Sequence, residues 1–148
     1  MKNKYLLIPL FLIFSCQLIA PKDEKLIIIE ESVKSALEIE DVLNLDKFNI
    51  DFSKVKYFDR KSIDEFLKDN TKFTEINDSI AKSELELNKD GFLPKTFIQF
   101  EEMEIHGDTI IINMGKYEAI DGACGIKVIF AKKNSKVKLV SSKETWVS

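Results

Sequence analysis

The single histidine of the chain lies between two carboxylates that stand at alternate positions of one short segment. Glu104, His106 and Asp108 stand at every second position, so an extended backbone would place all three side chains on one face. Two carboxylates and an imidazole could hold a divalent metal ion or transfer a proton near neutral pH. Gly107 predicts a turn within this segment, which would break the alignment. A solvent-exposed hairpin end is therefore the simpler interpretation of these residues.

A second polar segment, 86–93, resembles the first half of an EF-hand calcium loop. Such a loop needs oxygen ligands at alternate positions, which are here Glu86, Asn88 and Asp90. Gly91 stands where the loop would turn sharply. However, Pro94 occupies the ninth place, and Phe97 stands where a bidentate glutamate would close the site. A polar helix end that leads into an Asp-Gly turn is the favoured interpretation, with calcium or another divalent metal as the alternative.

The remaining reactive residues do not form a coherent active site. Cys124 lies among small residues beside a turn, whereas a nucleophilic cysteine needs a histidine or another cation next to it. Glu101 and Glu102 would point to opposite faces of a regular strand, which makes them a poor acid/base pair. Trp146 is expected to close the core over the last strand, with ligand contact as the alternative. The sequence has no glycine-rich phosphate loop, Ser-His-Asp order or nucleophile elbow.

The N-terminal residues have the features of an export signal. Lys2 and Lys4 form a short positive region, and 5–14 is an apolar run of about ten residues, the usual length for such a signal. The run ends in Ile-Phe-Ser-Cys, in which the small Ser15 stands directly before Cys16. A cysteine thiol is a good nucleophile once it is ionised, so it can accept a lipid.

This arrangement resembles the lipobox of bacterial lipoprotein precursors. The resemblance covers residues 1–16 and implies that Cys16 takes a diacylglyceryl group and that the bond after Ser15 is cut. It also implies that 16–25 is a lipidated tether; two or more acyl chains hold a protein stably on a membrane. Ordinary secretion is the alternative. A transmembrane helix is not predicted, because 5–20 is shorter than the roughly 20 residues that a span needs.

Composition indicates that 26–148 forms one globular domain. It is long enough to bury a core, and 45% hydrophobic residues with 11 phenylalanines argue against disorder. Loss of Lys2 and Lys4 would make the formal net charge two units more negative than −3, which argues against a surface that binds nucleic acid or anionic lipid. Gln17, where lipoprotein sorting rules would read an aspartate, implies the outer membrane. The expected partners are the membrane, through the acyl chains, and an unknown protein or small ligand; no cofactor other than the lipid is expected.

Apolar spacing predicts helices in the first half of this domain. Asp23 is a predicted N-cap, and 26 to about 44 has helical periodicity, although its first four residues could instead form a buried strand. A short half-buried strand is predicted at 48–52. The capping-box residues at 62–65 begin a short helix, and a third helix is predicted over 75–87.

The second half predicts β-strands. Four β-rich runs are separated by turn-forming residues, and these runs are 96–105, 109–119, 123–131 and 136–147. Lysines around the last turn are typical of a protected sheet edge, with an anionic partner as the alternative. The expected fold class is α+β, in which N-terminal helices pack on a C-terminal four-stranded antiparallel meander. This order of elements is similar to that of cystatin-like and nuclear-transport-factor-like folds.

The sequence favours a membrane-anchored lipoprotein whose domain binds a partner in the periplasm or at the cell surface without catalysis. An inhibitor or immunity-type protein against an enzyme of the envelope is a second hypothesis. A hydrolytic or metal-dependent enzyme is a third, and it would need a concave pocket that gathers His106 with Glu104 or Asp108.

Overall fold

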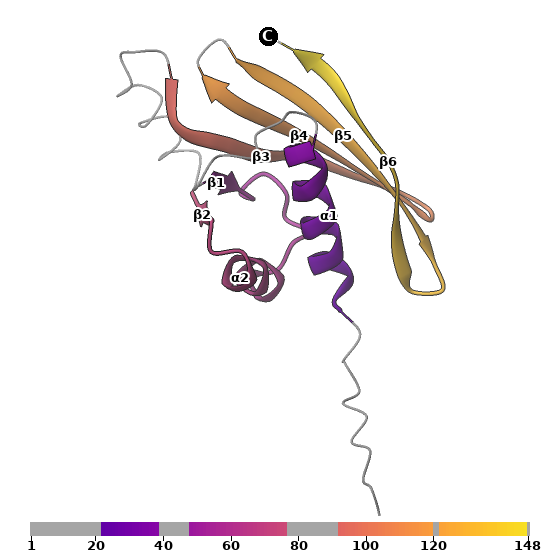
Figure 1. Ribbon diagram of the computed structural model, residues 1–148. Helices are drawn as coiled ribbons and strands as arrows, with labels where there is room; N and C mark the ends of the chain where they lie inside the picture. The colour runs from indigo at the N-terminus through magenta and orange to yellow at the C-terminus, as the bar shows by residue number, and fades with distance from the viewer. Residues whose placement is uncertain (1–21, 39–47, 77–91, 120–121, 148) are drawn as a thin grey trace, which may run out of the picture.

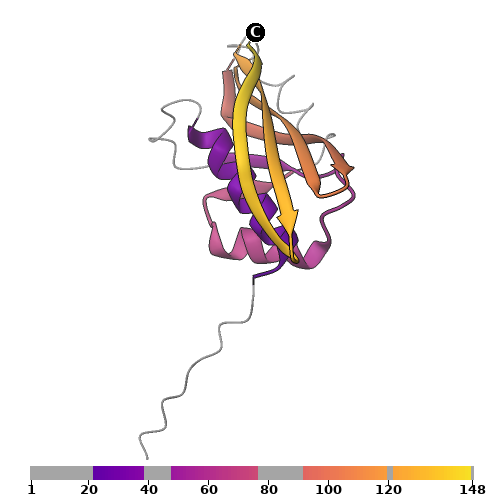
Figure 2. The same cartoon turned by 90° about the vertical axis from the view of Figure 1, so that its right-hand side faces the viewer.

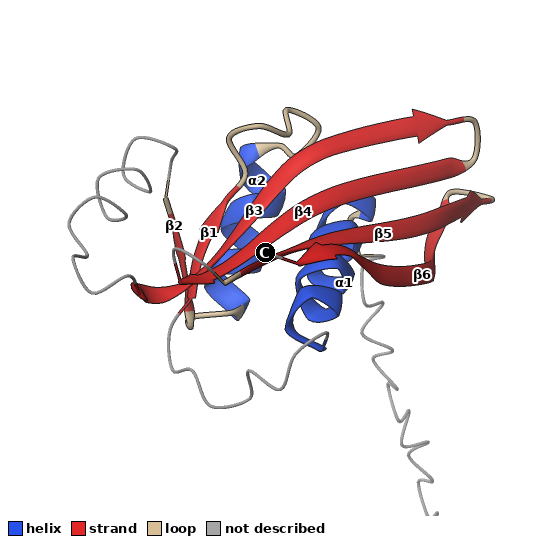
Figure 3. Cartoon of the chain, turned by 90° about the horizontal axis from the view of Figure 1, so that it is seen from above, coloured by secondary structure: helices blue, strands red, loops and turns tan. Residues whose placement is uncertain are grey.

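The computed structural model describes residues 22–38, 48–76, 92–119 and 122–147. These residues form a six-stranded sheet and two helices, which lie on the same side of the sheet (Figures 1 and 3). In chain order, the elements are α1 (Glu24–Glu38), β1 (Phe48–Asp51), α2 (Arg60–Asp69), β2 (Phe73–Glu75), β3 (Phe92–His106), β4 (Thr109–Ala119), β5 (Ala123–Lys133) and β6 (Lys136–Val147).

The sheet is mixed, with the strand order β2-β1-β3-β4-β5-β6. β1 pairs in parallel with β2 and β3, and the other neighbouring strands are antiparallel. The predicted four-stranded antiparallel meander is therefore wrong as a fold class, because the sheet has two further strands and a parallel part. β1 and β2 contain only four and three residues, so alternation could not reveal how they pair.

The parallel part of the sheet is built around α2. Parallel strands cannot be joined by a tight hairpin and need a crossover connection. α2 supplies that crossover between β1 and β2. Glu75 belongs to β2, so the helix predicted over 75–87 is wrong at its first residue, and 77–87 lies outside the described residues.

The four long strands follow the predicted runs closely. β4 and β6 have the predicted bounds, β3 begins earlier than predicted, and β5 continues to Lys133. β1 lies within the strand predicted at 48–52, but all four of its residues are buried, including Asn49 and Asp51. The expectation of a half-buried strand is therefore wrong, because polar side chains are packed on the face opposite the helices.

α1 packs across the antiparallel half of the sheet. It contacts β4, β5 and β6, and Figure 2 shows it running beside β6. Its buried apolar side chains recur at helical intervals, and they are Leu26, Ile28, Ile29, Val33 and Ala36. The open choice between helix and strand at 26–29 is thus settled as helix. The predicted residues 39–44 lie outside the described residues.

Both helices begin at an aspartate. The Asp23 side chain accepts a hydrogen bond from the Lys25 backbone N–H at 2.8 Å, which confirms its role at the start of α1. Asp59 caps α2, because its carboxylate accepts from the backbone N–H and the hydroxyl of Ser62, both at 2.9 Å. The capping box predicted to begin at Ser62 is therefore wrong by one turn: Ser62 is a donor within the helix.

The core between helices and sheet is rich in phenylalanine. Phe100 on β3 is fully buried, and its ring stacks on Phe52 at 4.9 Å between centroids. Phe58 meets the same ring edge to face at 5.3 Å. These contacts join the parallel and antiparallel parts of the sheet into one core.

Register shifts interrupt the antiparallel ladders at four places. Two lie in the pairing of β3 with β4, between Phe92 and Phe97 and between Phe100 and Glu102, and two lie in the pairing of β5 with β6. The last three shifts leave Glu101, Val140 and Thr145 as extra residues on their strands. Among the described residues, no helix is both long enough and apolar enough to cross a membrane.

Candidate functional site

The sheet face opposite the helices carries a groove of about 600 Å³ that crosses the strands. We call it the open-face groove, and its lining residues are Lys54, Glu101, Glu102, Asn113, Met114, Ile126, Lys127, Thr145 and Trp146. Most of these residues come from the four antiparallel strands. The groove is therefore positioned by the hydrogen-bonded ladder of the sheet.

Strand register aligns two transverse rows of residues on this face, and four of these residues line the groove: Glu102, Asn113, Lys127 and Trp146. One row, from β1 to β6, is Asp51, Gln99, Gly115, Gly125 and Trp146. The next row, from β3 to β6, is Glu102, Asn113, Lys127 and Lys143. Because directly paired residues point to the same face, both rows project on the side away from α1.

The glycine pair in the first row lets two aromatic rings lie on the sheet backbone. A Cβ on Gly115 would lie 2.7 Å from the Tyr117 ring, and one on Gly125 would lie 2.0 Å from Nε1 of Trp146. Real Cβ contacts are essentially never closer than 3.0 Å. Glycine at both positions is thus a condition for this arrangement of rings.

Trp146 is exposed over 41% of its surface. The interpretation of this residue as closing the core is wrong, because β6 is the edge of the sheet and Trp146 projects on the face opposite α1. One side of the indole rests on Gly125, and the ring remains open to solvent. It is the only tryptophan of the chain, so its fluorescence reports directly on this surface.

Tyr117 and Glu101 form one wall beside the glycine pair. The Tyr117 hydroxyl donates to Oε1 of Glu101 at 2.9 Å, and its ring stacks on Phe97 at 5.5 Å between centroids. Burial and the neighbouring Glu101 carboxylate raise the pKa of Tyr117 to about 12. The phenol is therefore a fixed donor at neutral pH.

The bulge in β3 turns two consecutive carboxylates toward the same groove. Glu101 bonds to Tyr117, and Glu102 accepts from Nδ2 of Asn113 at 3.2 Å. The prediction that Glu101 and Glu102 point to opposite faces is wrong, because the register shift after Phe100 inserts an extra residue.

A chain of hydrogen bonds fixes the other end of the first row. Nε2 of Gln99 donates to Oδ2 of Asp51 at 2.8 Å, and Nζ of Lys54 donates to Oε1 of Gln99 at 2.8 Å. Asp51 also accepts from the Ser53 backbone N–H at 2.7 Å. Since Asp51 and Gln99 are buried, this chain holds Lys54 at the rim of the groove.

The predicted histidine site lies elsewhere, at the turn between β3 and β4. Nε2 of His106 and Oε2 of Glu104 are 2.8 Å apart, and both side chains are exposed. Gly107 has φ +59 and forms the turn together with Asp108, so Asp108 does not continue the strand that carries Glu104 and His106. In the part of the chain that the structure describes, no three His, Cys, Asp or Glu side chains form a group that could hold a metal ion.

The other predicted sites have different outcomes. Cys124 is buried, as expected for a packed position. Lipidation at Cys16, cleavage after Ser15 and the calcium-loop residues Glu86, Asn88 and Asp90 lie outside the described residues.

The groove itself was not predicted. Gly115 and Gly125 inside strand patterns are a signal of close approach by another group. Their mutual pairing, and the pairing of Gly125 with Trp146, depend on a register that one strand's sequence does not contain.

Comparisons with known proteins do not assign a family or a function to this groove. No protein-family model, curated protein or solved structure matches the chain. Function is therefore inferred from the groove and from the N-terminal sequence.

Proposed function

We propose that this protein is a membrane-anchored lipoprotein whose domain binds a small ligand in the open-face groove, without catalysis. The observation that supports it best is the exposed Trp146 indole, which lies against Gly125 at one end of the groove. The signal and lipobox at residues 1–16 supply the expected address, on the periplasmic or outer surface of the envelope.

The groove has the properties of a small-molecule site. Its volume lies within the range of about 300 to 1,000 Å³ that is typical of ligand pockets. One large aromatic surface stands among a few polar groups, of which Asn113 and Glu102 already orient each other. Because these groups project from paired strands, they are positioned more firmly than loop residues would be.

The carboxylates of the groove act as hydrogen-bond acceptors in this proposal. Glu101 is engaged by Tyr117 and Glu102 by Asn113, while Lys54, in the turn after β1, and Lys127, on β5, supply donors. A ligand with an apolar face and several hydroxyl, amide or carboxylate groups matches this mixture.

Trp146 fluorescence tests the binding proposal. Glycan fragments and short peptides from the cell envelope are titrated into the full chain while the emission of its single tryptophan is recorded. A compound that binds the groove is expected to change the Trp146 emission in a saturable way. Calorimetry of the Trp146→Ala variant should show no binding of that compound. Trp146→Phe, which keeps an aromatic face, should retain part of the affinity. Binding that survives unchanged in Trp146→Ala would reject the groove as the site.

Metabolic labelling tests the anchor separately. Cells that express the wild-type chain and the Cys16→Ala variant are given radioactive palmitate, and the labelled protein is isolated. Label is expected in the wild type alone. Label retained by Cys16→Ala would reject lipidation at this cysteine.

An inhibitor or immunity-type role is a second candidate, which one observation favours. Three of the exposed large apolar side chains lie on the edge strand β6, and they are Val140, Trp146 and Val147. Such a strip could block an enzyme of the same compartment. Co-purification of one enzyme that Val140→Asp abolishes would support this role, and unchanged recovery with Val140→Asp would reject it.

A further inference from the structure

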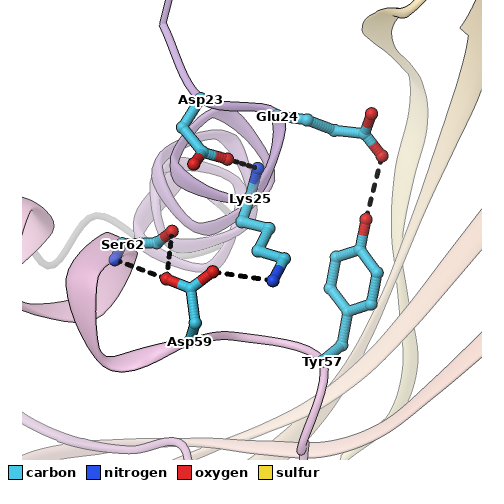
Figure 4. Close-up of polar contacts among 6 residues, drawn as sticks. All are labelled: Asp23, Glu24, Lys25, Tyr57, Asp59 and Ser62. Carbon is cyan, nitrogen blue, oxygen red and sulfur yellow. Dashed lines mark hydrogen bonds and ion pairs between the residues drawn. The ribbon is translucent and has the colours of Figure 1, made fainter.

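The first turn of α1 is fastened to two other parts of the domain, the segment before α2, which Figure 4 shows, and the end of β5. Nζ of Lys25 lies 2.7 Å from Oδ2 of Asp59, the cap of α2. Glu24 accepts from the Tyr57 hydroxyl at 2.9 Å and pairs with Nζ of Lys132, at the end of β5, at 2.7 Å. We call these five residues the N-terminal clasp. It fixes where the chain enters the domain relative to the β5–β6 hairpin.

The clasp also defines which end of the domain faces the anchor. Figures 1 and 2 show the chain entering at the end where α2 and the β5–β6 hairpin lie, with the C-terminus at the opposite end. Lys22 is six positions after Cys16. Six residues can span at most about 20 Å, so a lipid on Cys16 would keep this end of the domain close to the membrane.

The hairpin at this end carries three exposed lysines. Lys133 and Lys136 are register partners, and Lys138 pairs with Ala131 on the same face. None of the three forms an ion pair with another described residue, whereas Lys132 is held by Glu24. Asp108, in the neighbouring turn, is outnumbered by these lysines. The hairpin is therefore a local basic surface on a chain whose formal net charge is −3.

The turn between these lysines is tight. Asn134 and Ser135 have φ values of 51 and 59, as a two-residue hairpin turn requires. Lysines that directly flank such a turn lie side by side at the tip. Because the fold already holds these charges together, less conformational entropy is lost when they bind an anionic surface.

We propose that the β5–β6 hairpin contacts the membrane that bears the lipid on Cys16, and that Lys133, Lys136 and Lys138 bind anionic phospholipid headgroups there. This inference rests on the proposed lipid anchor. In this arrangement, the three lysines lie close enough to the membrane surface for an attraction between charges, which at physiological salt extends over roughly 8 to 10 Å. Trp146, near the C-terminus, is then displayed on the side of the molecule away from the membrane.

Depth-dependent quenching tests the orientation. The acylated full chain is reconstituted into vesicles of phosphatidylcholine, alone or with about one phosphatidylglycerol in three lipids. A fluorophore is attached through Ser135→Cys at the hairpin tip or Val147→Cys near the C-terminus, and headgroup nitroxides serve as quenchers. Quenching several-fold stronger at position 135 than at 147, and increased by phosphatidylglycerol, is the expected result.

A matched pair of variants isolates the lysines. Lys133→Gln/Lys136→Gln should lose the increase due to phosphatidylglycerol, since each lysine near an anionic surface contributes about five-fold to the population in contact. Lys34→Gln/Lys143→Gln removes the same charge elsewhere and should retain it. Equal quenching at both positions, or an increase that survives in the hairpin variant, would overturn the inference.

Vesicle flotation in high salt separates the two proposals. Salt weakens lysine contacts but not acyl insertion. Protein that floats in high salt but shows no preferential quenching at position 135 retains the anchor and refutes the hairpin contact. Protein that does not float refutes the anchor, and the hairpin inference fails with it.

Discussion

Trp146 and Gly125 are register partners on β6 and β5, and the indole lies directly against the glycine backbone. A Cβ at position 125 would be 2.0 Å from Nε1 of the indole and 2.4 Å from its Cδ1. The exposed position of the ring is thus determined by the absence of a side chain on the neighbouring strand.

Gly125→Ala should displace the Trp146 ring. The new methyl group cannot fit beneath the indole, so we expect a changed emission spectrum, weaker ligand binding and about 1 to 3 kcal/mol of destabilisation from overpacking. Fluorescence and urea denaturation measure these effects. Gly107→Ala is the matched control: its Cβ would meet nothing within 4 Å, so its cost comes from φ +59 alone and the emission should not change.

Phe100→Ala should be among the most destabilising single changes. The ring is fully buried and contacts Phe52 and Phe58, so its removal leaves a cavity between the two parts of the sheet. We expect a loss of about 3 to 5 kcal/mol in the free energy of unfolding, measured in urea. Ile105→Ala on the same strand, where 53% of the side chain is exposed, should change it by under about 0.5 kcal/mol.

Substitutions at Asp59 should separate capping from charge pairing in the clasp. Asp59→Asn keeps an N-cap side chain but loses the ion pair with Lys25, whereas Asp59→Ala loses both. The midpoint of urea denaturation should therefore fall in the order wild type, Asn, Ala. An alanine variant as stable as the asparagine variant would show that the cap contributes nothing.

The same position predicts an acid dependence. Hydrogen bonds from Lys25 and Ser62 hold the pKa of Asp59 well below its usual range. A lowered pKa in the folded state stabilises the protein above the unfolded value of about 3.9, and this contribution is lost as the pH falls below it. The difference in urea midpoint between wild type and Asp59→Asn should therefore shrink between about pH 5 and pH 2. A difference that stays constant over this window would contradict the assignment.

Stability should also fall at alkaline pH because of Tyr117. Burial and Glu101 raise the pKa of this residue from 10.0 to about 12. A raised pKa means that the folded state holds the proton more tightly, so the stabilisation is complete below pH 10 and is lost as the pH rises toward 12. Tyr117→Phe should flatten this decline, measured by urea denaturation across that window. Tyr57, also raised to about 12, should account for a second part of it.

The exposed pair of His106 and Glu104 should contribute little to stability. Both side chains face solvent, so His106→Ala should change the free energy of unfolding by under about 0.5 kcal/mol. Two side chains are also too few to hold zinc firmly. Thermal melting with and without zinc should therefore give the same midpoint for wild type and variant. A zinc-dependent increase that His106→Ala removes would restore the metal hypothesis.

The fold was predictable where long segments carry their own pattern. The β-rich runs of β4 and β6, each preceded by turn-forming residues, identify these strands at their observed bounds, and the apolar spacing from Leu26 identifies α1. The parallel pairing of β1 was not predictable, because it depends on contacts with segments distant in the sequence.

The groove shows the same limit at the level of single residues. The glycines at 115 and 125 and the tryptophan at 146 are visible in the sequence, but only register brings them into one row. The inserted Glu101 moves Glu102 to the face opposite the one that simple alternation after Phe100 assigns to it. The shape of the groove thus depends on strand register and on a bulge, which a regular alternation of side chains does not predict.

The extra residues of β6 have a consequence for how copies of this protein would coexist. β6 forms one edge of the described sheet, and Val140 and Thr145 each interrupt its ladder with β5. With the proposed lipid anchor, copies of this protein in one bilayer would meet at a higher effective concentration than in solution. At that concentration, an uninterrupted edge strand would pair with the edge strand of another copy and polymerise. The bulges oppose this pairing, because they twist the unpaired backbone N–H and C=O groups of β6 away from a straight row.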